Sequence, residues 1–155
     1  MTRHLRKTPL VFALSLAVAT AACSGGGDDD DAATITPLPC TPLASTLTAL
    51  QAGIFTPNCA LGSCHDSVAP EEGLNLSSAS ASRASMVSVS ANQMFNNAAI
   101  LLVDTAGGAN ASYLIKKVQG ATGIQGGRMP LNSGMLCAEK IDALTAWIES
   151  GAPSN

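Results

Sequence analysis

Cys59-Ala60-Leu61-Gly62-Ser63-Cys64-His65 is the stretch on which the interpretation of this 155-residue chain depends. Two thiols separated by a short loop, with an imidazole directly after the second, can hold a haem through two thioether bonds and place a proximal ligand under its iron. Four residues separate these cysteines, whereas two is the commoner spacing. The pattern predicts one covalent haem c, attached at Cys59 and Cys64 with His65 as the proximal ligand.

A second iron ligand is available at Met129, inside Gly126-Gly127-Arg128-Met129-Pro130. Met135 follows six residues later in the same glycine-rich loop and is the fallback ligand. Met86 and Met94 are expected to fill the core instead, because an unbranched thioether side chain packs well into irregular gaps. The sequence therefore offers one His–Met ligand pair with a single alternative methionine.

Residues 1–22 have the pattern of an export signal and are excluded from the fold. A basic start precedes an apolar run, Pro9 to Ala22, which is too short to span a bilayer stably. Small residues lead into Cys23, as in a bacterial lipoprotein signal, so Cys23 is the expected lipidation site. The alternative is ordinary cleavage after Ala19-Thr20-Ala21, which would leave Cys23 as a free thiol.

Residues 23–40 are expected to form a flexible acidic tether. Glycines follow Ser24, and the carboxylates of Asp28–Asp31 repel one another, so this stretch cannot bury apolar surface. Ser24 after the lipidated cysteine resembles the sorting signal for the outer membrane. We therefore expect an exported protein, lipid-anchored at the cell envelope and facing the periplasm or the cell surface.

The charge pattern excludes a nucleic-acid partner. The chain carries 8 Lys and Arg against 11 Asp and Glu, and no basic cluster or aromatic-plus-basic stripe marks a nucleic-acid surface.

After Cys23, four cysteines remain. If haem occupies two of them, Cys40 and Cys137 are left as a disulfide pair, which would stabilise the fold by roughly 4 kcal/mol. The alternative is two unrelated buried cysteines.

Residues 41–155 show the periodicity of one small, mainly helical domain. Thr41-Pro42 is expected to begin a helix that ends between Gly53 and Pro57. A short helix is expected over 81–87, and Asn110 is expected to cap a helix over 111–119 that stops at Gly120. The last helix is expected over 137–150. Glycine-rich residues 120–134 predict a loop, and 100–103 alone shows strand-like alternation.

These features together resemble a known family. In chain order they are Ile54-Phe55-Thr56-Pro57, the Cys59–His65 motif, Ala111-Ser112-Tyr113-Leu114, Arg128-Met129-Pro130 and the closing Trp147-Ile148 helix. The set is similar to class I monohaem cytochrome c domains, in particular those of exported proteins in myxobacteria and planctomycetes. It spans roughly residues 43–153. Residues 104–110 replace the Pro-Gly-Asp-Pro run that such domains often have.

The resemblance implies an all-α fold: a small helical domain wrapped around one covalent haem, with long Gly- and Ser-rich loops. It implies that Cys59 and Cys64 hold the porphyrin and that His65 and Met129 ligate the iron, with the thioether raising the reduction potential. The implied function is single-electron transfer between redox protein partners, with no small-molecule substrate. His65 is the only histidine after His4, so bis-histidine ligation within one subunit is excluded.

Two other function classes stay open. The first is a five-coordinate haem sensor or enzyme, against which the chain offers no second histidine for acid–base chemistry and no Ser-His-Asp set. The second is a haem-free structural or binding lipoprotein stapled by disulfides Cys59–Cys64 and Cys40–Cys137. In a weaker variant of the second, Cys59, Cys64 and His65 bind zinc, although adjacent donors chelate one ion poorly.

Replacement of the predicted lipidation site tests the membrane anchor. We expect Cys23→Ser to move the exported protein from the membrane fraction to the soluble fraction and to abolish labelling by palmitate, because acyl chains supply the membrane affinity. Cys40→Ser is the matched control and should remain membrane-bound. Soluble wild-type protein that carries a Cys23 thiol would contradict the prediction.

Overall fold

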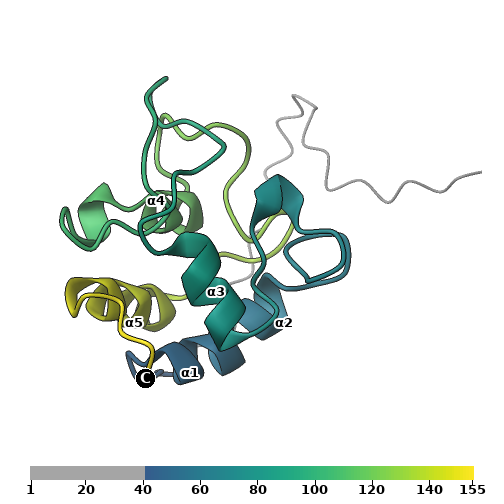
Figure 1. The fold of residues 1–155 in the computed structure, drawn as a ribbon, viewed down its shortest axis with the longest axis vertical. Coiled ribbons are helices and arrows are strands. Elements are labelled where there is room, and N and C mark those ends of the chain that lie inside the picture. Colours follow the sequence, from purple (N-terminus) through teal and green to yellow (C-terminus); the bar gives the residue numbers. More distant parts are fainter. Residues whose placement is uncertain (1–40) are drawn as a thin grey trace, which may run out of the picture.

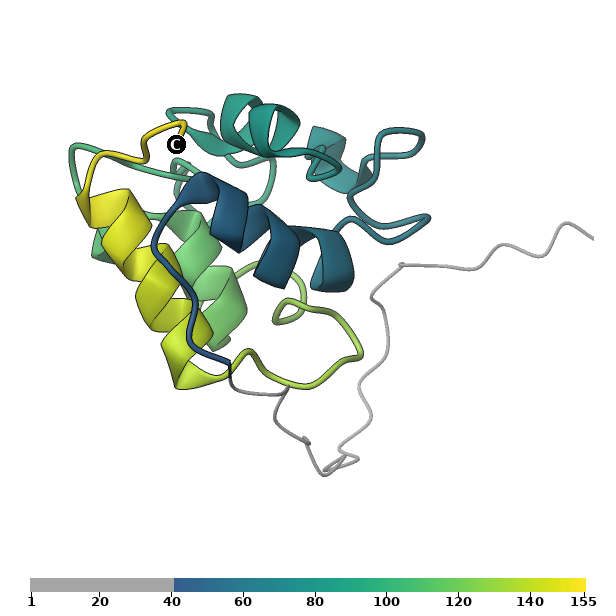
Figure 2. The same cartoon turned by 90° about the horizontal axis from the view of Figure 1, so that it is seen from below.

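The computed structural model describes residues 41–155, so the predicted signal, tether, lipidation site Cys23 and disulfide partner Cys40 all lie outside the described residues. Within 41–155 the chain is all-helical, with four helices and no strands (Figure 1). The expected all-α class is confirmed at this level. Long loops join the helices, and the loop of residues 59–76 lies on the same side of the helices as the loop that follows α4 (Tyr113–Gln119) (Figure 2).

The first helix is continuous over residues 47–58 but changes its winding. It consists of α1 (Leu47–Leu50), a π-helical segment (Gln51–Phe55) and α2 (Thr56–Asn58). Its cap is Thr46, whose hydroxyl accepts the amide N–H of Ala49 at 3.2 Å. The expected start at Thr41-Pro42 is therefore wrong, and residues 41–44 are not helical.

A distant residue explains why this helix begins where it does. Asn155 accepts the amide N–H of Leu47 through its side-chain oxygen at 3.2 Å and that of Thr48 through its backbone oxygen at 3.1 Å. These are among the amides that a helix start leaves without intrahelical partners. The end of the described chain thus joins Thr46 in satisfying the start of its first helix.

The other three helices lie close to their expected positions. They are α3 (Ala79–Met86), α4 (Tyr113–Gln119) and α5 (Ala138–Glu149). Asn110 is not the cap of α4: it lies in a 3₁₀ turn (Ala109–Ala111), and Ser112 precedes the helix. Gly120 ends α4 in the left-handed conformation at φ 67°, as expected of a glycine stop.

Residues 87–103 form a loop that is held by isolated bridges rather than by strands. Val87 pairs with Val103 in parallel and Ser90 pairs with Leu101 in antiparallel orientation. The alternation at 100–103 therefore marks extended backbone, with Val103 fully buried, but the segment is too short to form a sheet.

The core lies where the first helix, α3, α4 and α5 meet. Trp147 of α5 is fully buried and donates its indole N–H to the Pro153 carbonyl at 2.9 Å. Phe55 is buried in the same cluster. The largest fully buried side chains are Trp147, Tyr113, Phe55, Leu50, Ile54, Met86, Leu144, Ile148 and Val103. The cluster fixes the end of the first helix, from which the Cys59 loop departs.

Truncation of the largest core side chain measures how much the fold depends on this cluster. We expect Trp147→Ala to lower the free energy of unfolding by about 3–5 kcal/mol, because it leaves a cavity and an unpaired carbonyl. Val68 is 87% exposed, so Val68→Ala should change stability by less than about 0.5 kcal/mol. Urea unfolding checks both variants, and equal midpoints would contradict this description of the core.

Candidate haem-binding site

The Cys59–His65 motif begins at the last turn of the first helix and folds back on itself. Cys59 follows Asn58 and still donates its amide N–H to the Phe55 carbonyl at 2.9 Å. Inside the motif, the Cys64 N–H donates to the Leu61 carbonyl at 2.9 Å and the His65 N–H donates to the Cys59 carbonyl at 3.2 Å. The backbone therefore brings both ends of the motif together at the helix terminus.

The His65 ring is oriented by a backbone carbonyl. Its Nδ1 lies 3.2 Å from the carbonyl oxygen of Glu71, which can only accept, so Nδ1 carries the proton in this contact. In the neutral imidazole this leaves the lone pair on Nε2. A histidine that binds a metal usually donates its other ring N–H in this way. The tautomer that this contact implies therefore fits an iron ligand through Nε2.

The backbone around His65 is held in turn by the segment that follows it. The His65 carbonyl accepts the Leu76 N–H at 2.8 Å, and the Cys64 carbonyl accepts the Glu71 N–H at 2.7 Å. Leu76 is buried in the core, with 2% of its surface exposed. The imidazole is thus connected to the hydrophobic core through one short hydrogen-bonded loop.

Burial favours the neutral forms of Cys59 and His65. It lowers the pKa of His65, although the carbonyls of Glu71 and Leu74 and the charge of Glu71 act in the opposite direction. Burial also raises the pKa of Cys59 to about 12, with a further contribution from Cys64 beside it. A desolvated site of this kind disfavours a thiolate, whereas a thioether carries no charge. A neutral thiol and a neutral imidazole are compatible with covalent attachment of a haem.

Met129 lies in the loop of residues 120–134, which is attached to α4. Its amide N–H donates to the Lys117 carbonyl at 2.9 Å, and its side chain is half-buried. Met135 is 40% exposed. The expectation for Met86 is confirmed, since it is fully buried, but that for Met94 is wrong because its loop leaves it 49% exposed.

Arg128 braces this loop, and Cys137 lies at the start of the last helix. Arg128 donates to the Ser133 carbonyl at 2.8 Å, so its guanidinium braces the loop internally. Cys137 is buried at the start of α5, and none of the three cysteines among residues 41–155 is in a disulfide. The predicted pair Cys40–Cys137 extends beyond the described residues.

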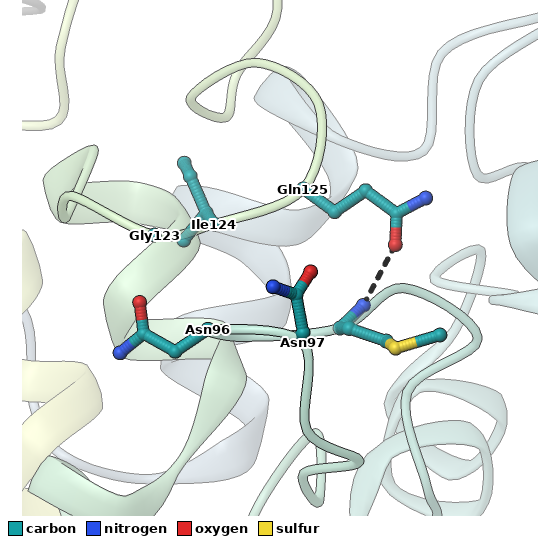
Figure 3. Close-up of a pocket in the computed structure, with 6 residues that line it drawn as sticks. Asn96, Asn97, Gly123, Ile124 and Gln125 are labelled. Atoms are coloured by element: carbon teal, nitrogen blue, oxygen red, sulfur yellow. Dashed lines mark hydrogen bonds between the residues drawn. The ribbon is translucent and has the colours of Figure 1, made fainter.

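A surface pocket lies elsewhere, between two loops. Figure 3 shows it lined by Asn96, Asn97, Gly123, Ile124 and Gln125, with the Gln125 side chain accepting the Met94 N–H at 3.0 Å. It contains none of the predicted haem ligands.

Among residues 41–155, no group of three or more His, Cys, Asp or Glu is placed to hold a metal ion. No helix in that range is long and apolar enough to cross a membrane.

Two contributors to the site, the Glu71 carbonyl and Lys117, could not be predicted from the sequence motifs. A backbone carbonyl leaves no signal in residue type. Lys117 carries a weak signal, because it lies four residues after Tyr113 and therefore on the apolar face of α4. Lys117 contributes through the Met129 loop, because its carbonyl accepts the Met129 N–H at 2.9 Å.

Comparisons with known proteins found no matching family model, no matching curated protein and no matching solved structure.

The pKa of Cys59 predicts slow alkylation of the haem-free, folded chain. A rise from 9.0 to about 12 lowers the thiolate fraction at pH 8 about thousandfold, and the thiolate is the nucleophile. We expect iodoacetamide to modify Cys59 at least a hundredfold faster in urea than in native buffer, measured by peptide mass mapping. Similar rates, in a sample whose circular dichroism shows native helix, would contradict the described burial.

Proposed function

We propose that this chain is an exported, lipid-anchored c-type cytochrome that binds one haem c and carries single electrons between redox protein partners. The observation that carries the proposal is the contact between His65 Nδ1 and the Glu71 carbonyl, which orients the ring. His65 directly follows Cys64, and its N–H donates to the Cys59 carbonyl. This arrangement supplies two sulfur attachment points and one oriented nitrogen from a single loop. Cys23 would provide the attachment to the membrane.

The chain's own residues would each have one task. Cys59 and Cys64 would keep the cofactor attached outside the cell, since thioether bonds do not dissociate. His65 would offer Nε2 and Met129 would offer its sulfur as iron ligands, with Pro130 restricting the chain after Met129. The haem itself would supply one-electron chemistry between ferric and ferrous iron.

Packing supports Met129 rather than Met135 as the distal ligand. A haem ligand must point toward the interior, and Met129 is half-buried on a loop bonded to α4, whereas Met135 has 40% of its surface exposed. If His65 and Met129 both bind the iron, the protein would leave no iron site for a substrate. This favours electron transfer over the five-coordinate sensor or enzyme.

A pair of methionine variants tests the ligand assignment. Protein matured with a cytochrome c maturation system should show a c-type spectrum and, when oxidised, the near-infrared methionine–iron charge-transfer band. Met129→Ala should abolish that band and lower the reduction potential, because the soft sulfur ligand is lost. Met135→Ala is the matched control and should leave both unchanged.

Other outcomes would redirect the proposal. A band that survives Met129→Ala and disappears in Met135→Ala would move the distal ligand along the loop. Rapid carbon monoxide binding by the reduced wild-type protein would favour a five-coordinate sensor or enzyme. A colourless product would favour the haem-free, disulfide-stapled lipoprotein.

A further inference from the structure

We propose that Lys117 is a positioning residue that holds the loop of residues 120–134, and with it Met129, against α4. The fixing of the loop follows from the contacts of Lys117 itself. The consequence for the iron rests on the proposed function, because it requires Met129 to be the distal ligand.

The Lys117 side chain is buried, and its acceptors belong to the loop. Its Nζ donates to the carbonyls of Gln125 at 2.9 Å and Gly127 at 3.0 Å, and the residue is 8% exposed. Lysine is almost never this buried unless it has partners, because desolvation of an ammonium is costly. These charge-assisted hydrogen bonds are the stronger kind, so the loop gains stable attachment points from them.

The backbone of the same residue binds the loop at a third point. The Lys117 carbonyl accepts the Met129 N–H at 2.9 Å. Side chain and backbone together therefore hold Gln125, Gly127 and Met129, which are every second residue of the segment. Gly126 and Gly127 contribute no side-chain packing of their own, so this segment depends on such contacts more than an ordinary loop would.

Tyr113 reinforces the attachment from the preceding turn of α4. Its hydroxyl accepts the Gln125 N–H at 3.2 Å and lies 3.2 Å from the Met94 carbonyl, to which it donates. Lys117 and Tyr113 thus hold Gln125 from two successive turns of the same helix.

Lys116 provides a matched control on the adjacent position of the same helix. Its Nζ donates to the Asn110 carbonyl at 2.7 Å and lies 4.5 Å from the centre of the Phe95 ring, away from the loop. Both residues are lysines in the last turn of α4, so they have equal helix propensity and equal formal charge. The backbone carbonyl of Lys116 accepts the Ala121 N–H at 3.0 Å, but its side chain donates to Asn110 and not to the carbonyls of Gln125 and Gly127.

Hydrogen–deuterium exchange of the full chain, as isolated from the maturation host, reads the attachment directly. We expect Lys117→Met to speed exchange in the peptide covering residues 125–129 about tenfold or more, and Lys116→Met to leave it unchanged. Lys117→Arg keeps the charge and the donors and should restore most of the protection. Equal exchange in the two methionine variants would overturn the proposal.

Two further readouts keep the test decisive. If Lys117→Met does not fold, amide exchange in the wild-type protein tests the attachment. The Met129 amide should exchange as slowly as core amides of α4. Exchange at the rate of an unfolded peptide would overturn the proposal. In haem-loaded samples, Lys117→Met should weaken the methionine–iron band while the c-type spectrum persists. A colourless sample would refute the proposed function, yet the exchange data would still test the attachment.

Discussion

The hydrogen bond between His65 Nδ1 and the Glu71 carbonyl is the contact on which the candidate site depends. It fixes both the tautomer and the direction of the imidazole, at a distance of 3.2 Å. The carbonyl can do so because the loop between them is closed by the Glu71 N–H to Cys64 and by the Leu76 N–H to His65. Leu76 belongs to the core, so helix packing and ligand orientation are parts of one structure.

Desolvation is the second constraint, and it shifts the pKa values of three groups in or near the site. Burial raises the pKa of Cys59, lowers that of His65 and lowers that of Lys117. Each shift favours the neutral form of the group. An environment of this kind suits thioethers and a neutral imidazole, and it makes any charge that is retained, such as the Lys117 ammonium, strongly dependent on its carbonyl partners.

Helix existence could be predicted from the sequence, because the apolar periodicity of α3, α4 and α5 is local. The start of the first helix could not: Thr41-Pro42 and Thr46 are both plausible caps, and the choice is reinforced by Asn155, 108 positions from Leu47. The π-helical winding of Gln51–Phe55 likewise has no evident signal in the sequence.

Within the site, the motif residues could be predicted because their side chains carry the chemistry. The residues that support them could not. Glu71 acts through its backbone, and a lysine in a helix beside a second lysine suggests a solvated face, yet Lys117 is buried while its neighbour Lys116 is not. Sequence patterns therefore identify candidate ligands more readily than the contacts that hold them.

We propose that one haem is bonded covalently to Cys59 and Cys64. The intact mass of the full chain, exported from a host with a cytochrome c maturation system and measured after denaturation, is the decisive test of that bond. We expect the mass of the processed polypeptide plus one haem, and loss of that addition when both cysteines are replaced by alanine. A colourless protein with the mass of the polypeptide alone, or lighter by the hydrogens of disulfides, would contradict it.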